Sequence, residues 1–267
     1  MSVPDLDELA AAIQSGGKYR DLHPDLVRRI AARELAKGRG FKDALKAARS
    51  KLHQMGGAYT ERPEDYARLS SELGELPRDL QAAQVKAFCL KAMELHASSR
   101  ERLPILSEFY ELALGGRAIA SLLDLACGLN PLALPWMPLA PGFSFFACDI
   151  YANQLDFLNR FFAHFNLDAR AEPWDLLDGA PPVPAEAALL LKTIPCLEQA
   201  DKTIGRRLLE SLPAPLALVS FPAASLGGRQ KGMLKNYEAH FWALLEGMPW
   251  SAEKLPLDGE LLFLLRK

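Results

Sequence analysis

Acidic residues that follow short apolar runs are the side chains in this chain best placed to bind a small ligand. The run 121–125 contains Asp124 and leads through Ala126 and Gly128 into Asn130-Pro131. The run predicts a buried strand, the glycine allows a tight turn beneath a ligand, and Asn-Pro can start a helix. Strand, small-residue loop and helix in this order are typical of nucleotide pockets in α/β proteins. We therefore expect a ligand pocket at this loop.

Two more carboxylates follow predicted strands in the same way. Asp149 ends the run 143–149, and Asp175 comes after Trp174 at the end of the run 168–173. The carboxyl ends of parallel strands meet at one edge of a sheet, where ligands bind. A carboxylate at 149 suits the two ribose hydroxyls of an adenosine, and one at 175 suits the adenine amino group. The three strand ends together predict a ligand that contains adenosine.

The single glycine of the first loop separates two cofactor classes. A dinucleotide requires a Gly-x-Gly-x-x-Gly loop, in which the second glycine lies against the pyrophosphate. S-adenosylmethionine has no phosphate and needs one glycine near its methionine part. The loop around Gly128 therefore disfavours NAD and favours S-adenosylmethionine, with S-adenosylhomocysteine as the product.

Other chemically capable residues surround the predicted sheet. Lys192 ends the fourth apolar run, and the loop 227–232 reads Gly-Gly-Arg-Gln-Lys-Gly. Glycines around two cations allow close approach to a phosphate backbone, although a connector with solvated charges has the same composition. His96 and Arg102 precede the sheet and can reach back to the carboxylate of the cofactor. The alternative for Arg102 is a cap on the edge of the sheet.

The charge of the chain is unevenly distributed. The formal net charge is −2, but residues 16–55 hold eleven Lys or Arg against four acidic residues, so this segment carries +7 and the remainder −9. Lys42, Lys46, Arg49 and His53 form one stripe along a predicted helix. Any one of these side chains can be an ordinary solvated residue, but the cluster favours contact with phosphates. A basic module on an acidic body predicts a nucleic-acid partner.

Hydrophobic periodicity divides the chain into two parts. Residues 1 to about 115 predict helices only, whereas apolar runs of strand length alternate with helical stretches after residue 121. The predicted helices of the first part cover 22–35, 41–55, 62–73, 77–95 and a stretch from 98 to about 115. The predicted strands are 121–126, 143–149, 168–173, 187–193, 215–221, 252–257 and 260–266. The predicted helices between them lie near 131–138, 151–166, 197–211 and 233–246.

This alternation predicts the α/β class with a Rossmann-like sheet of seven mostly parallel strands, covered on both faces and preceded by an all-helical domain. The turn signal Asp258-Gly259 predicts that the sheet ends with one antiparallel strand. No apolar run approaches the roughly 18 residues of a membrane span, and the acidic start does not look like a signal peptide. The four scattered cysteines form no Cys-x-x-Cys pair, which favours thiols in a reducing cytoplasm over a metal site.

Several motifs give the chain a family resemblance along almost its whole length. They are Gly17-Lys-Tyr-Arg20, Ala47-Ala-Arg-Ser-Lys-Leu-His53 with Gly57-Ala-Tyr59, Leu95-His-Ala-Ser-Ser-Arg-Glu-Arg-Leu103, Leu123-Asp-Leu-Ala-Cys-Gly-Leu-Asn-Pro-Leu-Ala133, Cys148-Asp-Ile150, Lys192 with Pro195, Ser220-Phe-Pro222 and Ser225-Leu-Gly-Gly-Arg-Gln-Lys-Gly-Met233. With these motifs the chain resembles the aminoglycoside-resistance 16S rRNA methyltransferases that modify N7 of guanosine 1405.

The resemblance implies a helical domain over 1–105 that docks on the 30S subunit and an S-adenosylmethionine-dependent methyltransferase domain over 106–267. It implies that the cofactor is held by His96, Arg102, Ala126, Gly128, Asp149, Ile150, Trp174, Asp175 and Leu176. It also implies that the target base is positioned by Lys192, Arg229 and Lys231. The residues that it implies for RNA contact are Lys18, Arg20, Lys46, Arg49, Lys51, His53 and Lys235. The expected protein is a cytoplasmic monomer that acts on 16S rRNA within the assembled 30S subunit, without metal or membrane.

Two positions depart from the family pattern. Ala224 stands where most relatives have a basic residue, which removes one possible phosphate contact, and Trp174 stands where Gln is common. The alternatives are a small-molecule methyltransferase with a helical lid, a non-catalytic 30S-binding relative, and a methyltransferase for adenine N1 in the same decoding region. Guanine N7 carries a lone pair and no proton, so its methylation needs positioning and no general base.

Overall fold

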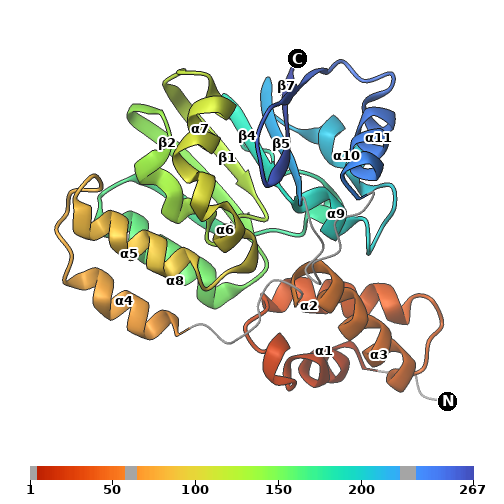
Figure 1. The fold of residues 1–267 in the computed structure, drawn as a ribbon. Helices are drawn as coiled ribbons and strands as arrows, with labels where there is room; N and C mark the ends of the chain where they lie inside the picture. The colour runs from red at the N-terminus through yellow and green to blue at the C-terminus, as the bar shows by residue number, and fades with distance from the viewer. Residues whose placement is uncertain (1–4, 58–64, 223–232) are drawn as a thin grey trace.

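A seven-stranded sheet between two layers of helices forms the body of the protein, with a lobe of three helices below it (Figure 1). The computed structural model describes residues 5–57, 65–222 and 233–267. The lobe consists of α1 (Leu6–Gln14), α2 (Pro24–Leu35) and α3 (Phe41–Leu52) with short helical turns between and after them. In the described part of the chain, no helix has the length and apolar character that crossing a bilayer requires.

The strand order of the sheet is β3-β2-β1-β4-β5-β7-β6. The strands are β1 (Ile119–Leu125), β2 (Leu139–Asp149), β3 (Asp168–Pro173), β4 (Ala187–Leu191), β5 (Leu216–Pro222), β6 (Ser251–Leu255) and β7 (Glu260–Arg266). Strands β1 to β5 are parallel, and β7 runs antiparallel to both β5 and β6. The predicted mostly parallel sheet is confirmed. One detail differs: the antiparallel strand lies inside the edge, because the 258–259 hairpin folds β6 onto the outer side of β7.

The order of the strands reverses between β1 and β4, since the chain first adds β2 and β3 on one side and then β4 and β5 on the other. Helices that leave two neighbouring strands toward opposite sides open a crevice beyond the strand ends, and ligands of open α/β sheets bind there. The fold therefore places its ligand crevice at the carboxyl ends of β1 and β4.

Alternating residues of the strands pack into two separate cores. Leu122 of β1 and Phe145 of β2 face one core, whereas the next residues, Leu123 and Phe146, face the other. The first core is covered by α4 (Tyr66–Gly74), α5 (Ala83–Met93), α7 (Leu106–Leu114) and α8 (Ala152–His164). The second is covered by α9 (Thr193–Leu197), α10 (Ile204–Ser211), α11 (Met233–Leu245) and the lobe. Strands buried on both faces explain the nearly continuous apolar runs of the sequence.

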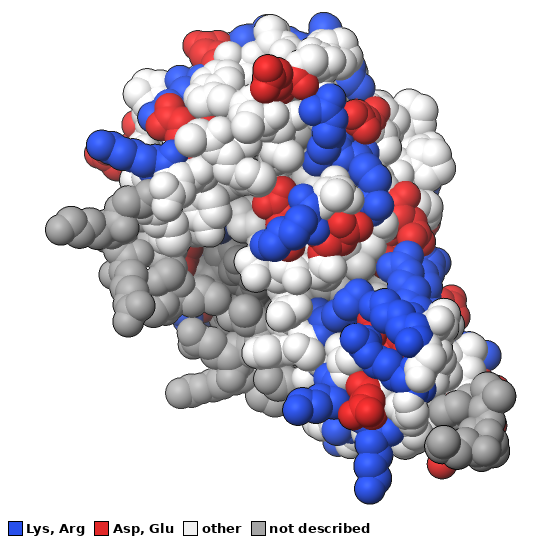
Figure 2. All heavy atoms as spheres, turned by 90° about the vertical axis from the view of Figure 1, so that its right-hand side faces the viewer, with Lys and Arg blue, Asp and Glu red and all other residues white. Residues whose placement is uncertain are grey.

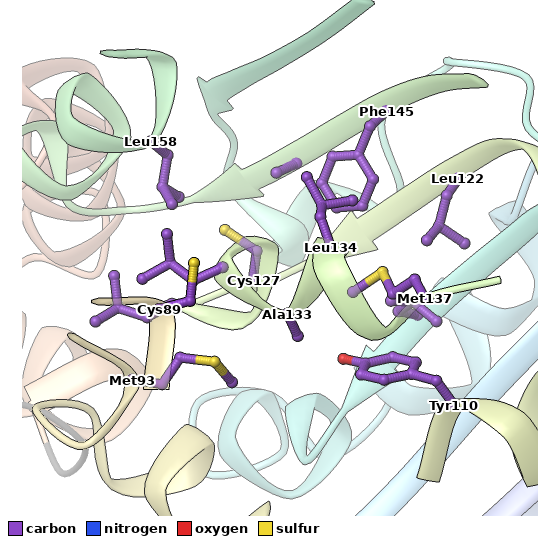
Figure 3. Close-up of a cluster of buried hydrophobic side chains, with 14 of the residues drawn as sticks. Cys89, Met93, Tyr110, Leu122, Cys127, Ala133, Leu134, Met137, Phe145 and Leu158 are labelled. Atoms are coloured by element: carbon purple, nitrogen blue, oxygen red, sulfur yellow. The ribbon is translucent and has the colours of Figure 1, made fainter. Parts of the chain in front are cut away.

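The first core joins helices from before the sheet to the sheet itself (Figure 3). Cys89 and Met93 of α5, Tyr110 of α7 and Phe145 of β2 belong to this one cluster, in which Leu134 lies next to Phe145. Burial raises the pKa of the Cys89 thiol to about 12, so this thiol is a packing residue. Helices α4 and α5 thus share their core with the sheet. The domain limit at residue 105 stays a prediction, and this packing favours a limit between α3 and α4.

Three predicted helices differ from those in the structure. The segment 131–138 forms a 3-10 helix (Asn130–Trp136), because Pro131 and Pro135 lack the N–H groups of an α-helical ladder. The predicted helix 197–211 begins only at Ile204, as α10, and a separate short helix, α9, covers Thr193–Leu197 before it. The predicted helix 77–95 is shortened to α5, because the segment from Pro77 to residue 82 forms turns.

The lobe is attached to the sheet by backbone hydrogen bonds. The His23 N–H donates to the carbonyl of Ile150 at 2.9 Å, and the Ala152 N–H donates to the carbonyl of Asp21 at 2.7 Å. Between them Leu22 forms an antiparallel bridge to residue 151. The lobe therefore adds a short strand-like segment just beyond the carboxyl end of β2, next to the ligand crevice.

Four charged side chains reinforce this attachment. Arg29 and Arg33 of α2 both pair with Asp178, and Arg33 Nη1 lies 3.4 Å from the buried carboxylate of Asp175. Asp175 and Asp178 follow β3, so the cluster joins α2 to the carboxyl end of that strand. Two arginines against two carboxylates leave the cluster neutral.

We expect Arg33→Ala to loosen the contact between the lobe and the sheet. A half-exposed ion pair contributes up to about 1 kcal/mol, which corresponds to about fivefold in an opening equilibrium. Hydrogen exchange of the Ala152 amide, which donates to the lobe, should therefore accelerate by up to about fivefold at low salt, and less at high salt. Arg28→Ala is the control, because its partner Asp7 belongs to the lobe itself. Equal exchange in both variants would contradict a docking role for the cluster.

Candidate cofactor cleft and nucleic-acid interface

A cleft lies at the carboxyl ends of β1, β2 and β4, at the predicted crevice. The space between its walls, including the part open to solvent, is about 660 Å³. Its walls are formed by Met55, His96, Ser98, Ala126, Asp149, Ile150, Tyr151, Trp174, Leu176, Leu191, Lys192, Thr193, Cys196 and Leu197. Seven of the predicted site residues are among them. The lobe contributes Met55, so the cleft is bounded by both parts of the protein.

The floor of the cleft is the loop after β1. Ala126 and Gly128 both have positive φ angles, of 53° and 52°. A side chain at position 128 would place its Cβ 2.7 Å from Cε1 of His96, so only glycine fits under this ring. The Gly128 N–H donates to Oδ2 of Asp149 at 2.8 Å. The loop thus brings the ends of β1 and β2 together, as the sequence predicts.

Asp149 is held as an acceptor at the rim of this loop. Its Oδ1 accepts the N–H of Ile150 at 2.6 Å, and its Oδ2 accepts that of Gly128. Burial raises the pKa of Asp149 above its usual range, and hydrogen bonds from neighbouring donors, those of the Gly128 and Ile150 N–H groups foremost, offset part of that effect. A carboxylate fixed in this way is suited to accept from two neighbouring hydroxyl groups.

An apolar wall lies beyond Asp149. Ile150, Trp174 and Leu176 line the cleft there, and the Trp174 indole N–H donates to the carbonyl of Gly179 at 2.9 Å. This bond fixes the plane of the indole. The predicted Asp175 lies behind the wall: its Oδ1 accepts the Leu177 N–H at 3.0 Å, and its other oxygen faces α2. The structure therefore engages Asp175 with the lobe, and its contact with a ligand stays a prediction.

Lys192 stands on the opposite side of the cleft. It has a positive φ of 59° at the end of β4, and its N–H donates to Oγ of Ser220 at 3.1 Å. Its ammonium donates to Glu101 at 2.5 Å and to the carbonyl of Ser98 at 3.4 Å, and it lies 3.7 Å from Glu260. The side chain is only 2% exposed. The predicted position of Lys192 in the cleft agrees with the structure.

Arg102 lies beneath the cleft floor, in a buried polar network. Its guanidinium donates to both oxygens of Glu260, at 2.7 and 3.2 Å, and to Oδ1 of Asn130 at 3.1 Å. Asn130 also accepts from the Tyr110 hydroxyl at 2.6 Å and donates to Asp124 at 2.8 Å. Burial alone would raise the pKa of Glu260, but Arg102 and Lys192 hold it below its usual range. Arg102 thus supports the loop, and its predicted contact with the cofactor stays a prediction.

His96 lies next to this network and Asp124 belongs to it, and the pKa of each side chain is shifted from its usual value. Burial, with the cations Lys192 and Arg102 nearby, lowers the pKa of His96 to about 4. The imidazole is therefore neutral at pH 7, and its Nδ1 lies 3.2 Å from the hydroxyl of Ser98. Burial raises the pKa of Asp124 to about 7, although the Asn130 amide and Arg102 act in the opposite direction.

Basic side chains gather on the lobe, in the lower part of Figure 2. Arg20, Lys46 and His53 are exposed there, and Lys235 is exposed on α11. Two predicted RNA contacts are engaged within the protein. Arg49 donates to the carbonyl of Ala12 at 2.5 Å, and Lys51 lies 3.3 Å from the buried Glu34. The side chain of Lys18, together with Ala224, Arg229 and Lys231, lies outside the described residues.

The acidic residues that hold the basic ones were not among the predicted site residues. Glu101 and Glu260 bind Lys192 and Arg102, and Glu34 binds the lysines and arginine around it. A signal for Glu260 existed, since an acidic residue directly before the apolar run of β7 is unusual in a buried strand. Within residues 5–57, 65–222 and 233–267, no three His, Cys, Asp or Glu side chains are grouped as metal ligands would be.

We expect Asp124→Asn to change how stability depends on pH. The unfolded carboxyl releases its proton near the ordinary aspartate pKa of 3.8 and the native one at about 7, so between these values the native state holds more protons. Asp124 therefore makes the wild type less stable as the pH rises, and the variant lacks this loss. The free energy of unfolding of the variant minus that of the wild type should therefore increase by about 1.4 kcal/mol for each pH unit across this window.

Denaturant unfolding of both proteins from pH 4 to 7 measures this difference. The wild-type curve alone is insufficient, because the lowered pKa of His96 makes the native state more stable as the pH rises from about 4 to 6.5, opposite to Asp124. A difference between variant and wild type that does not change with pH would contradict the raised pKa of Asp124.

Comparison with known proteins agrees with this geometry. The ribosomal RNA methyltransferase (FmrO) family matches residues 15–264. The chain is 36% identical to the 16S rRNA (guanine(1405)-N(7))-methyltransferase of Frankia casuarinae over 98% of this chain and 94% of that protein. It is also 36% identical to the enzyme of that name from Serratia marcescens, over 98% of both chains.

Solved structures give the same result. The 16S rRNA methylase RmtB has a TM-score of 0.80 and 31% identity, with all of both chains covered. The 16S rRNA methyltransferase RmtF, solved in complex with S-adenosyl-L-homocysteine, has a TM-score of 0.79 and 33% identity over 98% of both chains. These matches confirm the resemblance that the motifs indicated. The chain belongs to the FmrO family of ribosomal RNA methyltransferases.

Proposed function

We propose that this protein transfers the methyl group of S-adenosylmethionine to N7 of guanosine 1405 of 16S rRNA in the 30S subunit, which gives resistance to aminoglycosides. The observation that carries the proposal is the position of the cleft. It has an adenosine-type acceptor in Asp149, a floor with a single glycine at Gly128, and a wall to which the basic lobe contributes Met55. The relatives that span nearly the whole chain carry this activity in their names.

The residues of the cleft fit this cofactor. Asp149 lines the cleft as a carboxylate suited to the ribose hydroxyls, and the wall of Ile150, Trp174 and Leu176 suits the adenine ring. Gly128 lets the neutral His96 ring pack directly against the loop after β1. The cofactor supplies a methyl group bound to a positively charged sulfur. A cation-poor cleft wall around Asp149 tolerates that charge.

The protein's own contribution to the reaction is positioning. Guanine N7 attacks with its lone pair, so no side chain has to remove a proton. Aligning two reactants near contact distance replaces a bimolecular encounter and supplies much of the acceleration. Lys192, fixed at the end of β4 on the far wall, is placed to donate to an acceptor on the target base. The base is flipped out of its helix to reach the cleft, at a cost of a few kcal/mol.

The lobe supplies the binding energy that offsets this cost. Arg20, Lys46 and His53 are exposed on it and are suited to phosphate contacts, which depend on salt. We propose that the protein acts as a monomer in the cytoplasm and recognises the folded RNA surface of the assembled 30S subunit.

Mapping the methylated nucleotide tests this function. Purified protein is incubated with 30S subunits and labelled cofactor, and 16S rRNA is then reduced, cleaved with aniline and read by primer extension. The proposal predicts one strong stop at guanosine 1405 and growth of an expressing strain on aminoglycosides. Modification of an adenine, 30S binding without transfer, or transfer only to a small molecule would each contradict it.

We expect Asp149→Asn to weaken cofactor binding by at least about tenfold, because an amide cannot accept on both sides from two hydroxyls while it also meets two backbone donors. Calorimetry with S-adenosylhomocysteine measures the dissociation constant. Asp156→Asn carries the same change on the exposed face of α8 and should leave affinity unchanged. Wild-type affinity in Asp149→Asn would contradict the ribose contact.

We expect Lys46→Glu to weaken binding to 30S subunits by about tenfold and to reduce the salt slope by about one, because one phosphate contact is lost. Binding is measured by sedimentation at several salt concentrations. Arg117→Glu is the matched control: Arg117 is exposed just before β1, at the opposite edge of the sheet from the cleft. Equal losses in both variants would indicate a general charge effect and contradict a specific contact.

A further inference from the structure

Glu101 and Lys192 form an ion pair that the established properties of the fold leave unexplained. Lys192 is 2% exposed, and its ammonium is bound by Glu101 at 2.5 Å and by the carbonyl of Ser98. Glu101, by contrast, is 42% exposed, although it contributes the nearest carboxylate to a buried lysine. Lys192 and Ser98 are part of the cleft wall, and Glu101 is bound to Lys192 there. The pair therefore lies at the wall of the cleft.

The charges beneath the cleft show why this lysine needs Glu101. Arg102 binds both oxygens of Glu260, so that carboxylate is already matched by a guanidinium. Lys192 lies farther from Glu260, at 3.7 Å, and Glu101 supplies its own balancing charge. Two cations and two carboxylates make this group neutral. Without Glu101 it would carry one positive charge that the solvent screens poorly.

The chemistry of the proposed reaction makes this balance important. The bond from guanine N7 to the methyl carbon forms with the lone pair of N7, and the carbon–sulfur bond breaks with its electron pair on sulfur. Sulfur becomes a neutral thioether, and the positive charge moves onto the purine. No proton is transferred. A lysine beside the purine would oppose this movement of charge if it were not neutralised, whereas a neutralised one can still donate a hydrogen bond.

We propose that Glu101 is a positioning residue of methyl transfer, which rests on the proposed function: it holds the Lys192 ammonium toward the target base and cancels its charge as the purine becomes cationic. Glu101 and His96 belong to the same segment, His96–Arg102, and His96 covers Gly128 in the floor of the cleft. This segment therefore connects the target side of the cleft to the cofactor side. Glu101 thus acts on the reacting base through Lys192.

Single-turnover methylation of 30S subunits by Glu101→Gln tests this inference. The amide keeps the size of the side chain and removes its charge. The rate at saturating 30S and cofactor should fall by about tenfold or more, while the dissociation constants of S-adenosylhomocysteine and of 30S subunits stay within about twofold. Glu111→Gln, an exposed residue of α7, is the matched control and should keep the wild-type rate. An unchanged rate, or a loss explained by weaker binding or unfolding, would overturn the proposal.

A second readout does not depend on activity. A small amine-reactive reagent is added to the intact protein, and modification of Lys192 and of exposed Lys46 is measured by mass spectrometry. In the wild type Lys192 should react several-fold more slowly than Lys46, and Glu101→Gln should raise its rate at least about threefold. Equal protection in both proteins would overturn the role of Glu101. If the wild type did not methylate guanosine 1405, the proposed function would fail, and this labelling would still decide whether Glu101 holds Lys192.

Discussion

The buried ion pair between Arg102 and Glu260 is the interaction on which the site depends. Arg102 is 1% exposed and stacks 4.6 Å from the Phe109 ring while its guanidinium binds both carboxylate oxygens of Glu260. Removing one partner of such a pair leaves an uncompensated buried charge, which costs about 3–5 kcal/mol. The pair joins the helical segment before the sheet to the antiparallel strand β7, which lies between β5 and β6. It therefore closes the polypeptide around the floor of the cleft.

Hydrogen bonds and close charge contacts connect the other parts of the site to this pair. Asn130 joins Arg102 to Asp124 beneath the loop after β1, and Ser220 of β5 donates to Glu260. Lys192, directly after β4, lies 3.7 Å from the same carboxylate. Side chains of β1, β5 and β7, Lys192, and the helical residues Arg102 and Asn130 thus meet in one polar network below the cleft. Because the network is buried, movement of one member changes the energy of all the others, and the cofactor and target sides of the cleft are held in one geometry.

The sequence predicted the site residues that stand at or just after the end of a single strand. Gly128, Asp149 and Lys192 end apolar runs, and the parallel topology alone brings such ends together. The ion partners were not predictable in this way. Arg102 and Glu260 are 158 residues apart, and their pairing depends on the position of β7 between β5 and β6.

The same limit applies where the lobe meets the sheet. A carboxylate after β3 suggested an adenine contact at Asp175, but the docking of α2 brings Arg29 and Arg33 to that side chain. Charge counting predicted a basic surface without showing which cations are already paired. Arg49 and Lys51 lie in the basic segment and are engaged with the lobe itself, whereas Lys46 is exposed. Local pattern thus predicts elements and strand ends, and tertiary contacts decide which charges stay available.

The arrangement of lobe, cleft and buried network implies one specific complex with RNA. A structure of the protein bound to 30S subunits with S-adenosylhomocysteine tests this most directly. We predict a flipped guanine in the cleft, its N7 facing the sulfur, with Lys192 still paired to Glu101 and the exposed cations of α3 on phosphates. A target base that remained stacked in its helix, or an RNA bound away from the lobe, would contradict the account.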